Sequence, residues 1–374
     1  MYTFDIVVPT LFGVEAITAK EIVNLGYDIK TITDGRVTFV GDFDAVARAN
    51  INLRTGERVL IKVAEFKALS FDELFENTYV VDWTFWLDKN AHFPVKGFSL
   101  KSKLYSVPDC QSIIKKAVVN SLMDKYKTSF LPERGTTYKI EFSIIKDTVT
   151  LMIDTTGTPL SKRGYRIKHN DAPLRESLAA SIAILSRFSY NSVVADPFCG
   201  SGTFPIEAAM IAKNIAPGVN REFSSMDFKQ IPKKLWMDAL EEARDCVRHD
   251  TKLKVYGSDI DKMCVEISKE NARNAGVDDI ITVTQMPLSE FSSDLSGGTI
   301  LCNPPYGERM LEIEACERLY SQMGNIYRNL DNWGLSALTP VETFEKFFGK
   351  NADKKRKLYN GMIKCCLYQY FKKR

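Results

Sequence analysis

Hydrophobic and polar positions in the first part of the chain follow two periods. Runs in which every second residue is apolar predict strands, and runs with apolar residues three and four positions apart predict helices. The first sixty residues give a strand, a helix, a hairpin and a second helix, at FDIVVPT (4–10), EAITAKEIVNLGY (15–27), TITDGRVTFVGD (31–42) and FDAVARANINLR (43–54). We expect residues 1–60 to form one small α+β domain.

A second unit follows. Its pattern predicts a strand at ERVLIKVAEFKA (57–68), helices at FDELFENTYVV (71–81) and SIIKKAVVNSLMDKY (112–126), and a hairpin of YKIEFSII (138–145) with VTLMID (149–154). The stretch TTGTPLSKRGYR (155–166) is rich in Thr, Gly and basic residues, which predicts a linker near residue 160. We therefore expect a domain over residues 61–158.

The pattern changes after the linker, where helices and short apolar strands alternate. Such alternation is typical of a mostly parallel sheet with helices on both faces. Asn360-Gly361 separates two β-prone runs, which predicts an antiparallel hairpin at the sheet edge. We expect this α/β domain over residues 159–374. Its predicted elements are helices at 174–188, 203–212, 262–276 and 313–330, and strands at 192–196, 254–259, 281–286, 298–303 and 334–340.

Length and composition are those of a multidomain globular protein. The 374 residues are 45% hydrophobic and 26% charged, and a single core stops growing near about 250–300 residues. The chain contains no apolar run of about 18 residues, the length that a membrane span needs. Its first residues lack the basic region of a signal peptide, so we expect a cytoplasmic protein without a membrane partner.

The cysteines and histidines do not predict a metal site. Eight cysteines are scattered without a C-x-x-C pair, and only three histidines are present. A structural zinc site needs four closely spaced ligands, so we expect no metal. Scattered thiols in a chain of this size predict buried, reduced cysteines, in keeping with the cytosol.

Charge is nearly balanced but clustered. The net charge is +3, so the whole protein is not a basic nucleic-acid binder. Each basic cluster alone is explained by a solvated surface, whereas several on one surface would contact phosphates. The clusters lie at residues 101–103, 115–116, 161–168, 233–234, 354–357 and 372–374.

The loop DPFCGSGTFPIE (196–207) follows a strand and opens a helix, as ligand-binding loops do. It lacks the lysine of a Walker A loop, and Pro205 stands where a dinucleotide loop has its third glycine. A plain strand-to-helix turn is the alternative without a ligand. The remaining candidate ligand is S-adenosylmethionine, with Asp196 facing its cationic end and Gly200 and Gly202 allowing close backbone approach.

Asp259 ends the next strand, VYGSD, after a long insertion at residues 214–250. A carboxylate at this place accepts hydrogen bonds from both ribose hydroxyls in nucleotide folds. The alternative is that Asp259 is the N-cap of the helix that starts near Asp261.

A second motif, NPPYGERM (303–310), directly follows the strand GTILC. Its prolines take the chain rigidly out of the sheet at the carboxyl end, where open α/β sheets bind ligands. The Asn303 side-chain oxygen and the Pro304 carbonyl can accept both hydrogens of an exocyclic base amine, and Tyr306 can stack on an extruded base. The alternative is a Pro-rich turn with a partly buried tyrosine.

Together, DPFCGSGT and NPPY resemble the first and fourth motifs of class I S-adenosylmethionine-dependent methyltransferases that act on base amino groups. GER after NPPY, and SKRGYR…APLRESLAA upstream, resemble RNA guanine-N2 methyltransferases more than DNA adenine-N6 enzymes. The N-terminal half resembles a ferredoxin-like domain followed by a THUMP RNA-binding domain. Nearly the whole chain is similar to bacterial 23S rRNA guanine-N2 methyltransferases, both the YpsC-like group and the N-terminal half of the fused enzyme.

This resemblance implies a fold, a cofactor and a set of site residues. The expected fold is an α/β, Rossmann-like methyltransferase domain preceded by α+β ferredoxin-like and THUMP domains. The cofactor is S-adenosyl-L-methionine, and Asn303, Pro304, Pro305 and Tyr306 are the catalytic residues. The cofactor-binding residues are Asp196, Phe198, Gly200, Gly202, Thr203, Asp259, Asn303, Pro173 and Glu176, with Ala172 and Leu174 beside them.

The third motif departs from the family pattern. The strand there ends in TQMPLSE without the acid that often lies near the adenine, so Gln285 or a backbone group is expected to replace it. Arg309 either binds a phosphate or pairs with an acid, and the isolated histidines are not expected to act as bases.

RNA is the expected partner of a monomer or weak homo-oligomer. The basic residues assigned to RNA contact are Lys103, Lys115, Lys116, Arg163 and Arg166, with solvated helix charge as the alternative for the lysines. Trp83, Phe85 and Trp86 either stack on RNA or pack in the core, and their spacing favours the core.

The leading hypothesis is methylation of the guanine N2 amine in 23S rRNA or an assembly intermediate. The same family permits tRNA as the substrate, and NPPY is shared with adenine-N6 methyltransferases. The hypothesis without catalysis is an RNA-binding protein with a vestigial cofactor site.

Overall fold

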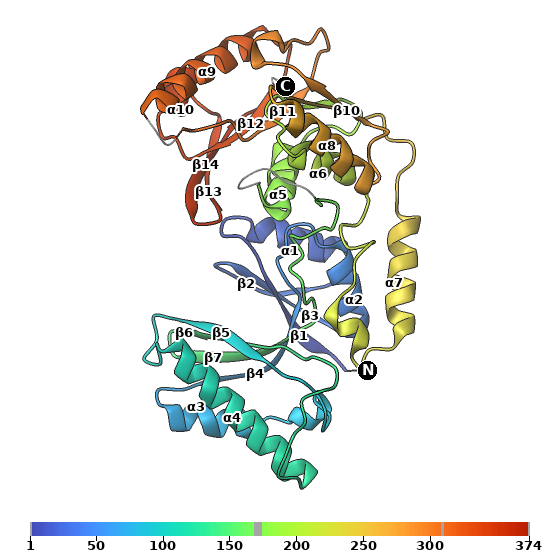
Figure 1. Ribbon diagram of the computed structural model, residues 1–374, viewed down its shortest axis with the longest axis vertical. Helices are drawn as coiled ribbons and strands as arrows, with labels where there is room; N and C mark the ends of the chain where they lie inside the picture. The colour runs from blue at the N-terminus through green and yellow to red at the C-terminus, as the bar shows by residue number, and fades with distance from the viewer. Residues whose placement is uncertain (1, 168–173, 308–309, 373–374) are drawn as a thin grey trace.

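The computed structural model describes residues 2–167, 174–307 and 310–372. Two seven-stranded sheets form the body of the molecule, one in each half of the chain. The C-terminal sheet with its helices lies at one end of the long axis, and the second domain of the N-terminal half lies at the other (Figure 1).

The first sixty residues fold as β1 (Phe4–Pro9), α1 (Glu15–Asn24), β2 (Ile29–Thr33), β3 (Arg36–Gly41), α2 (Phe43–Asn52) and the start of β4 (Leu60–Lys67). Strands β1 to β4 lie in the order β2-β3-β1-β4, and each neighbouring pair is antiparallel. Helix α2 begins where the Asp42 side chain accepts a hydrogen bond from Ala45 N. The predicted strand, helix, hairpin and helix are confirmed.

The second domain continues the same sheet, because β4 pairs with β1 on one side and with β7 on the other. Its elements are α3 (Phe71–Tyr79), a 3₁₀ turn (Trp83–Phe85), β5 (Val95–Leu100), α4 (Val107–Tyr126), β6 (Ile140–Ile145) and β7 (Thr148–Asp154). Strand β5 was not predicted, because VKGFSL carries a glycine and a lysine and lies at the sheet edge. Trp83 and Trp86 are buried, so the packed-core alternative is the right one.

The C-terminal sheet has the strand order β10-β9-β8-β11-β12-β14-β13. Strands β10 to β12 in this order are parallel, while β14 runs antiparallel to β12 and β13, which confirms the predicted hairpin. The strands are β8 (Val193–Asp196), β9 (Lys254–Asp259), β10 (Ile281–Gln285), β11 (Thr299–Cys302), β12 (Gly334–Thr339), β13 (Lys354–Asn360) and β14 (Ile363–Tyr370).

Helices cover both faces of this sheet, which confirms the α/β fold class. Leu301 packs with α5 and α6 on one face, whereas its neighbours Ile300 and Cys302 pack with α9 and α10 on the other, as the two-residue period of a strand requires. The helices are α5 (Glu176–Ser186), α6 (Thr203–Ala212), α7 (Lys233–Asp245), α8 (Lys262–Asn274), α9 (Met310–Asn329) and α10 (Phe344–Phe348).

The insertion at 214–250 packs on the N-terminal half. Helix α7 runs beside α2 along one flank of the molecule (Figure 1). Trp236 and Phe223 stack with ring centroids 5.4 Å apart, and both belong to the core that includes the first two domains. Arg48 of α2 pairs with Glu242 of α7 at 2.7 Å. The insertion therefore ties the two halves of the chain together.

Candidate active site

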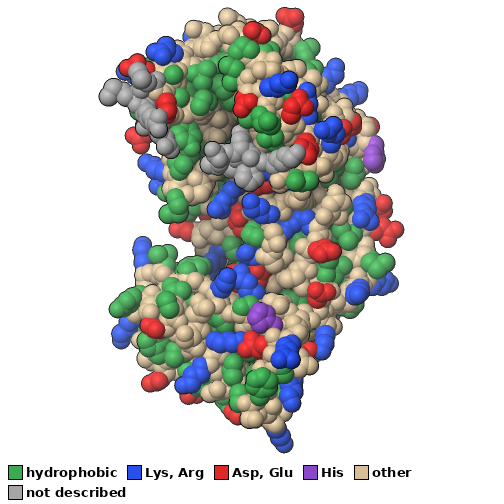
Figure 2. Space-filling model, in the orientation of Figure 1, with side chains coloured by type: hydrophobic (Ala, Val, Ile, Leu, Met, Phe, Trp, Pro, Cys, Tyr) green, Lys and Arg blue, Asp and Glu red, His purple; other side chains and the backbone are tan. Residues whose placement is uncertain are grey.

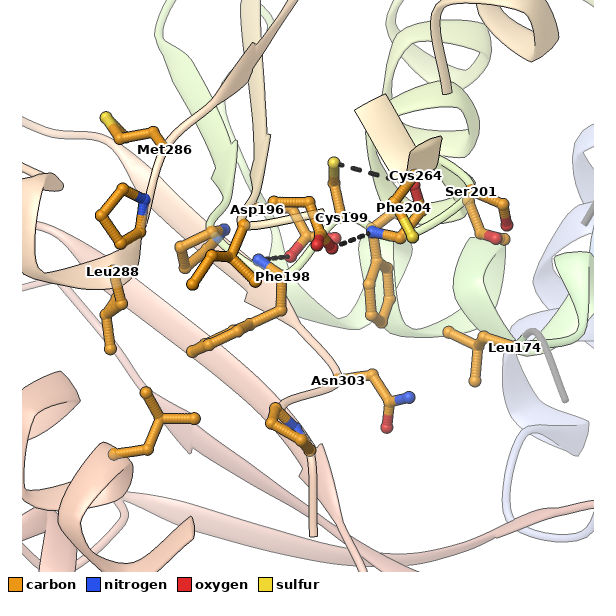
Figure 3. A pocket seen from close by; sticks show the side chains of 18 of the residues that line it. Leu174, Asp196, Phe198, Cys199, Ser201, Phe204, Cys264, Met286, Leu288 and Asn303 are labelled. Carbon is orange, nitrogen blue, oxygen red and sulfur yellow. Dashed lines mark hydrogen bonds between the residues drawn. The ribbon is translucent and has the colours of Figure 1, made fainter. Parts of the chain in front are cut away.

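A cavity of about 520 Å³ opens at the carboxyl ends of β8, β9, β10 and β11. Figure 3 shows Met286 and Leu288 at one end of it and Leu174 at the other, with Asp196, Phe198 and Asn303 between them. This is the position in which open α/β sheets hold their ligands. The two sequence motifs meet here, because residues within 196–204 of the first and Asn303, Pro305 and Tyr306 of the second contribute to the lining of the cavity.

The loop after β8 is a tight turn into α6. Gly202 has φ +83° and is the N-cap of α6, and Gly202 N donates to Cys199 O at 2.7 Å. A Cβ at position 202 would lie 2.3 Å from Ser268 Oγ on α8, so this glycine is required by packing. Gly200, Ser201 and Thr203 line the cavity, whereas Gly202 is not among the lining residues.

Asp259 connects this loop to the end of β9. One carboxylate oxygen accepts from Gly200 N and the other from Asp261 N, both at 3.0 Å. The N-cap of α8 is Asp261, whose side chain accepts from Met263 N at 2.8 Å. The N-cap alternative for Asp259 is therefore wrong, and Asp259 lines the cavity.

Asp196 is buried, with 2% of its surface exposed, and its carboxylate accepts from Phe198 N at 3.0 Å. Burial raises the pKa of Asp196 well above the usual range, and the nearby Asp259 raises it further. A cationic group in the cavity would favour the ionised form of Asp196, so the cavity is suited to a ligand with a positive centre.

The wall beyond Asp259 is apolar. Ile260 is 71% exposed, and Met286, Pro287 and Leu288 follow β10 around the same end of the cavity. Gln285 instead donates its side-chain amide to Ile260 O at 3.1 Å and is not among the lining residues. This apolar wall was not predicted, although its position directly after two strand ends was the available signal.

The second motif lines the opposite side. Asn303, Pro305 and Tyr306 face the cavity, whereas Pro304 is buried behind them. Tyr320 of α9 donates its hydroxyl to Pro305 O at 2.7 Å, and burial raises the pKa of Tyr320 to about 12. The hydroxyl therefore stays protonated and fixes the motif as a donor, a role that the sequence did not reveal.

Family comparisons match all three parts of the chain. Residues 163–369 match the RMKL-like methyltransferase domain, residues 5–60 the RlmL ferredoxin-like domain, and residues 68–154 the THUMP domain. The chain belongs to the RMKL-like methyltransferase family. The family and fold expected from the sequence are thereby confirmed.

Relatives of this RMKL-like methyltransferase include a putative RNA methyltransferase, YpsC, of Bacillus subtilis, which is 45% identical over 100% of this chain and 97% of its own. The ribosomal RNA large subunit methyltransferase K/L of Psychromonas ingrahamii is 31% identical over 97% of this chain and 49% of its own. The chain thus spans about half the length of the K/L relatives.

Two solved structures are similar over the whole chain. The putative methyltransferase SMU.472, solved with S-adenosylhomocysteine (SAH), is 43% identical, with a TM-score of 0.94 over 100% of this chain and 99% of its own. A predicted N6-adenine-specific DNA methylase from Listeria monocytogenes is 47% identical, with a TM-score of 0.95 over 100% and 97%. These similarities confirm S-adenosyl-L-methionine as the cofactor.

Residues upstream of the methyltransferase motifs are placed differently from the expectation. Glu176 is buried against Arg166, with Oε1 3.7 Å from Nη1, and is not among the residues that line the cofactor cavity. Arg166 is also largely buried, and its Nη2 donates to Leu174 O at 3.0 Å and to Thr203 Oγ1 at 2.6 Å. Pro173, Ala172 and Arg309 lie outside the described residues.

Two of the five basic residues assigned to RNA remain exposed. Lys103 and Lys116 face solvent, whereas Lys115 is partly buried and pairs with Glu133 at 2.6 Å. Arg163 is 4% exposed and donates to Glu207 and to Leu160 O. Arg163 and Arg166 are engaged in ion pairs inside the fold, and these buried positions do not support the prediction that they contact RNA.

The described part of this methyltransferase also lacks membrane-spanning helices and metal-binding groups of side chains. None of its described helices is long and apolar enough to cross a membrane. Across residues 2–167, 174–307 and 310–372, no group of three His, Cys, Asp or Glu side chains is arranged to hold a metal ion.

Proposed function

We propose that this protein transfers a methyl group from S-adenosyl-L-methionine to the N2 amine of a guanine in 23S rRNA. The observation that carries the proposal is the Asn303–Tyr306 motif, which faces the same cavity as Asp196 and Asp259. The cofactor supplies an electrophilic methyl group on a sulfonium, and the acceptor that this motif suits is an exocyclic amine.

The residues around the cavity fit the cofactor. Asp259 keeps lone pairs for ribose hydroxyls beyond the two backbone donors it already has. Ile260, Met286 and Leu288 offer apolar surface for an adenine ring, and Asp196 offers a carboxyl for the cationic end. Gly200 in the turn after β8 brings backbone to the cavity without a side chain of its own.

The second motif supplies acceptors for the target amine. In this proposal the Asn303 side-chain oxygen and the Pro304 carbonyl accept the two amine hydrogens, which directs the nitrogen lone pair toward the methyl group. Asn303 lines the cavity, whereas Pro304 is not among the lining residues. Tyr306 offers a ring on which an extruded base stacks, an interaction of roughly 1–3 kcal/mol. The bond from Tyr320 to Pro305 O keeps this loop in place, so the acceptors are preorganised.

The N-terminal half supports RNA as the substrate. It contains the THUMP domain match, and the two curated relatives are named as an RNA methyltransferase and a large-subunit rRNA methyltransferase. Lys103 is exposed on this domain beside Tyr105, which is 82% exposed. A cation next to a solvent-facing aromatic ring suits a single-stranded nucleic acid, where phosphates and bases are both accessible.

Two alternatives keep the chemistry and change the acceptor. The name of the Listeria structure favours adenine N6, and NPPY is compatible with that amine. A tRNA guanine is the other acceptor that a THUMP-containing methyltransferase would take. The alternative of an RNA-binding protein without catalysis requires that the Asn303–Tyr306 motif no longer binds a substrate base. The position of this motif in the cavity argues against that alternative.

Substitution of Asn303 tests the proposed role. Asn303→Ala should still bind S-adenosylmethionine, with a dissociation constant changed far less than turnover, and should lose at least about 100-fold in methyl transfer, since one preorganised polar group is worth that much. Calorimetry measures the first quantity and incorporation of labelled methyl groups the second. Turnover near the wild-type rate would show that Asn303 does not orient the amine.

A further inference from the structure

A second cavity of about 690 Å³ lies between the linker, the start of α5 and the insertion. We call it the linker groove, and it is lined by Glu57 and by residues within 158–166, 175–176 and 221–222. Its volume is within the range of sites that bind small molecules or nucleotides. In Figure 2, Lys and Arg side chains gather at the narrow middle of the molecule, between its two ends.

Four cations converge on the linker groove from three separate segments. Lys162 and Arg166 come from the linker, Arg175 from the residue before α5, and Arg221 from the insertion. Lys162 and Arg175 are exposed, so their charged ends are accessible to a ligand. Such convergence of long basic side chains is typical of phosphate-binding surfaces.

The acids in the groove are mostly engaged. Glu57 accepts a hydrogen bond from Ser177 Oγ at 2.6 Å, and Glu176 pairs with Arg166. Glu222 is exposed at the rim. Glu57 and Glu222 keep their negative charges, so the four cations of the groove exceed its three carboxylates by one positive charge, and the two exposed cations are Lys162 and Arg175.

Arg221 shows this excess most clearly. Its two terminal nitrogens donate to the backbone carbonyls of Thr158, at 2.6 Å, and Leu160, at 3.2 Å, so the guanidinium is held in place by neutral acceptors. Burial is the main cause that lowers the pKa of Arg221 to about 10; Arg163 and Arg58 lower this pKa further, while Glu176 raises it. An anion in the groove would compensate the charge of this partly buried guanidinium.

The linker groove is next to the cofactor cavity. Arg166 lines the groove, and the same side chain donates to Leu174 O and to Thr203 Oγ1, whose residues line the cofactor cavity. One buried arginine thus forms part of the wall between the two. A polynucleotide whose target base enters the cofactor cavity would have neighbouring phosphates within reach of the groove.

We propose that the linker groove binds the phosphodiester backbone of the RNA substrate beside the target nucleotide, through Lys162, Arg175 and Arg221. This inference rests on the proposed function for the identity of the polyanion. It assigns to the catalytic half of the chain an RNA contact that is separate from the THUMP domain.

The test compares two double variants of the full chain with the wild type. Lys162→Ala/Arg175→Ala removes the exposed cations of the groove, and Lys269→Ala/Lys346→Ala removes two exposed cations from α8 and α10 as a matched control. Binding of 23S rRNA transcribed in vitro is measured without cofactor, by filter retention over a series of KCl concentrations. S-adenosylmethionine binding and the thermal midpoint serve as checks on folding.

The groove variant should bind the RNA about tenfold more weakly near ~0.15 M salt, and its slope of log K against log salt should fall by about 0.7 for each phosphate that is no longer neutralised. In turnover, KM for RNA should rise while kcat is retained, and the control pair should match the wild type. Equal affinity and slope for the two double variants would overturn the proposal, as would a wild type that binds no RNA.

An added arm distinguishes RNA phosphate from a free anion. Inorganic phosphate should weaken wild-type RNA binding no more than KCl of equal ionic strength does. Saturable binding of inorganic phosphate to the wild type, absent in the groove variant and without effect on the affinity for RNA, would assign the groove to a small anion and overturn the RNA role. Methylation of an RNA other than 23S rRNA would instead contradict the proposed function and leave the groove intact.

Discussion

At the scale of single residues, the ionisation of Asp196 affects both the stability of the protein and its affinity for the cofactor. Its pKa is raised by burial, so ionisation of the folded protein without ligand costs free energy. The stability associated with the protonated form is fully present below the unfolded pKa, about 3.9, and is lost as pH rises through the higher folded pKa. A bound cation would stabilise the ionised form of Asp196 and so offset the free-energy cost of its ionisation.

We therefore predict that the affinity for S-adenosylmethionine falls as pH decreases through the raised pKa of Asp196, and that binding releases protons. Asp196→Asn should flatten this pH dependence and weaken binding, while raising the thermal midpoint of the ligand-free protein at neutral pH. Calorimetry in buffers of different ionisation enthalpy measures the protons released. A wild type with a flat pH profile would contradict the assigned role of Asp196.

The residues that could be predicted from the sequence are those whose chemistry is local. Asp196, Gly200 and Asn303 belong to short motifs after strand ends, and the structure brings them to one cavity. Arg163 and Arg166 were misread, because a basic cluster in the sequence does not show which cations are buried in ion pairs. Tyr320 was missed, since its contact with Pro305 crosses from helix to loop.

At the scale of elements, periodicity identified most strands and helices, and the elements that it missed or misplaced have physical causes. The hairpin of β13 and β14 was predicted from Asn360-Gly361, and Gly361 has φ +63° in the turn. Helix α4 begins at Val107, earlier than the predicted 112, because Pro108 is compatible with the first turn of a helix. The short α10 (Phe344–Phe348) was not predicted, as five residues give too little periodicity.

Helix α6 is buried throughout. The negative charge of its Glu207 is compensated by Arg163 of the linker. Glu207 on α6 accepts from Arg163 Nε at 3.3 Å and from the Tyr165 hydroxyl at 3.2 Å. Arg163→Ala would leave the Glu207 carboxylate buried without its cation, so we predict a loss of about 3–5 kcal/mol in the free energy of unfolding. Urea denaturation measures it.

The double variant Arg163→Met/Glu207→Leu is the control for this pair, because it removes both charges and keeps apolar volume. It should be much closer to the wild type than Arg163→Ala is. A loss of less than about 1 kcal/mol in Arg163→Ala would show that the ion pair does not stabilise the attachment of the linker to α6.

At the scale of the whole molecule, the insertion makes the N-terminal half depend on the catalytic half. Trp236 of α7 is 3% exposed in the core shared with the first two domains, whereas Met237, its neighbour on the same helix, is 67% exposed. No local pattern in the sequence indicated that α7 packs on α2. The residues that join these helices, such as Arg48 and Glu242, are nearly 200 positions apart in the chain. Their packing therefore depends on the assembled fold.

We predict that Trp236→Ala lowers the free energy of unfolding by about 3–5 kcal/mol and speeds hydrogen exchange in α2, which is in the N-terminal half. Met237→Ala should change neither quantity appreciably. Faster exchange confined to α7 itself would mean that the insertion does not support the first domain.

The proposed methylation of the guanine N2 amine in 23S rRNA is tested by identifying the nucleoside that receives the methyl group. The most direct measurement offers purified protein and labelled S-adenosylmethionine to unmodified 23S rRNA and, separately, to tRNA, followed by nucleoside analysis of the labelled RNA. We predict label in N2-methylguanosine from 23S rRNA, and loss of this label when the Asn303→Ala variant replaces the wild type. Label in N6-methyladenosine, label in tRNA alone, or no label while the cofactor binds would contradict this prediction.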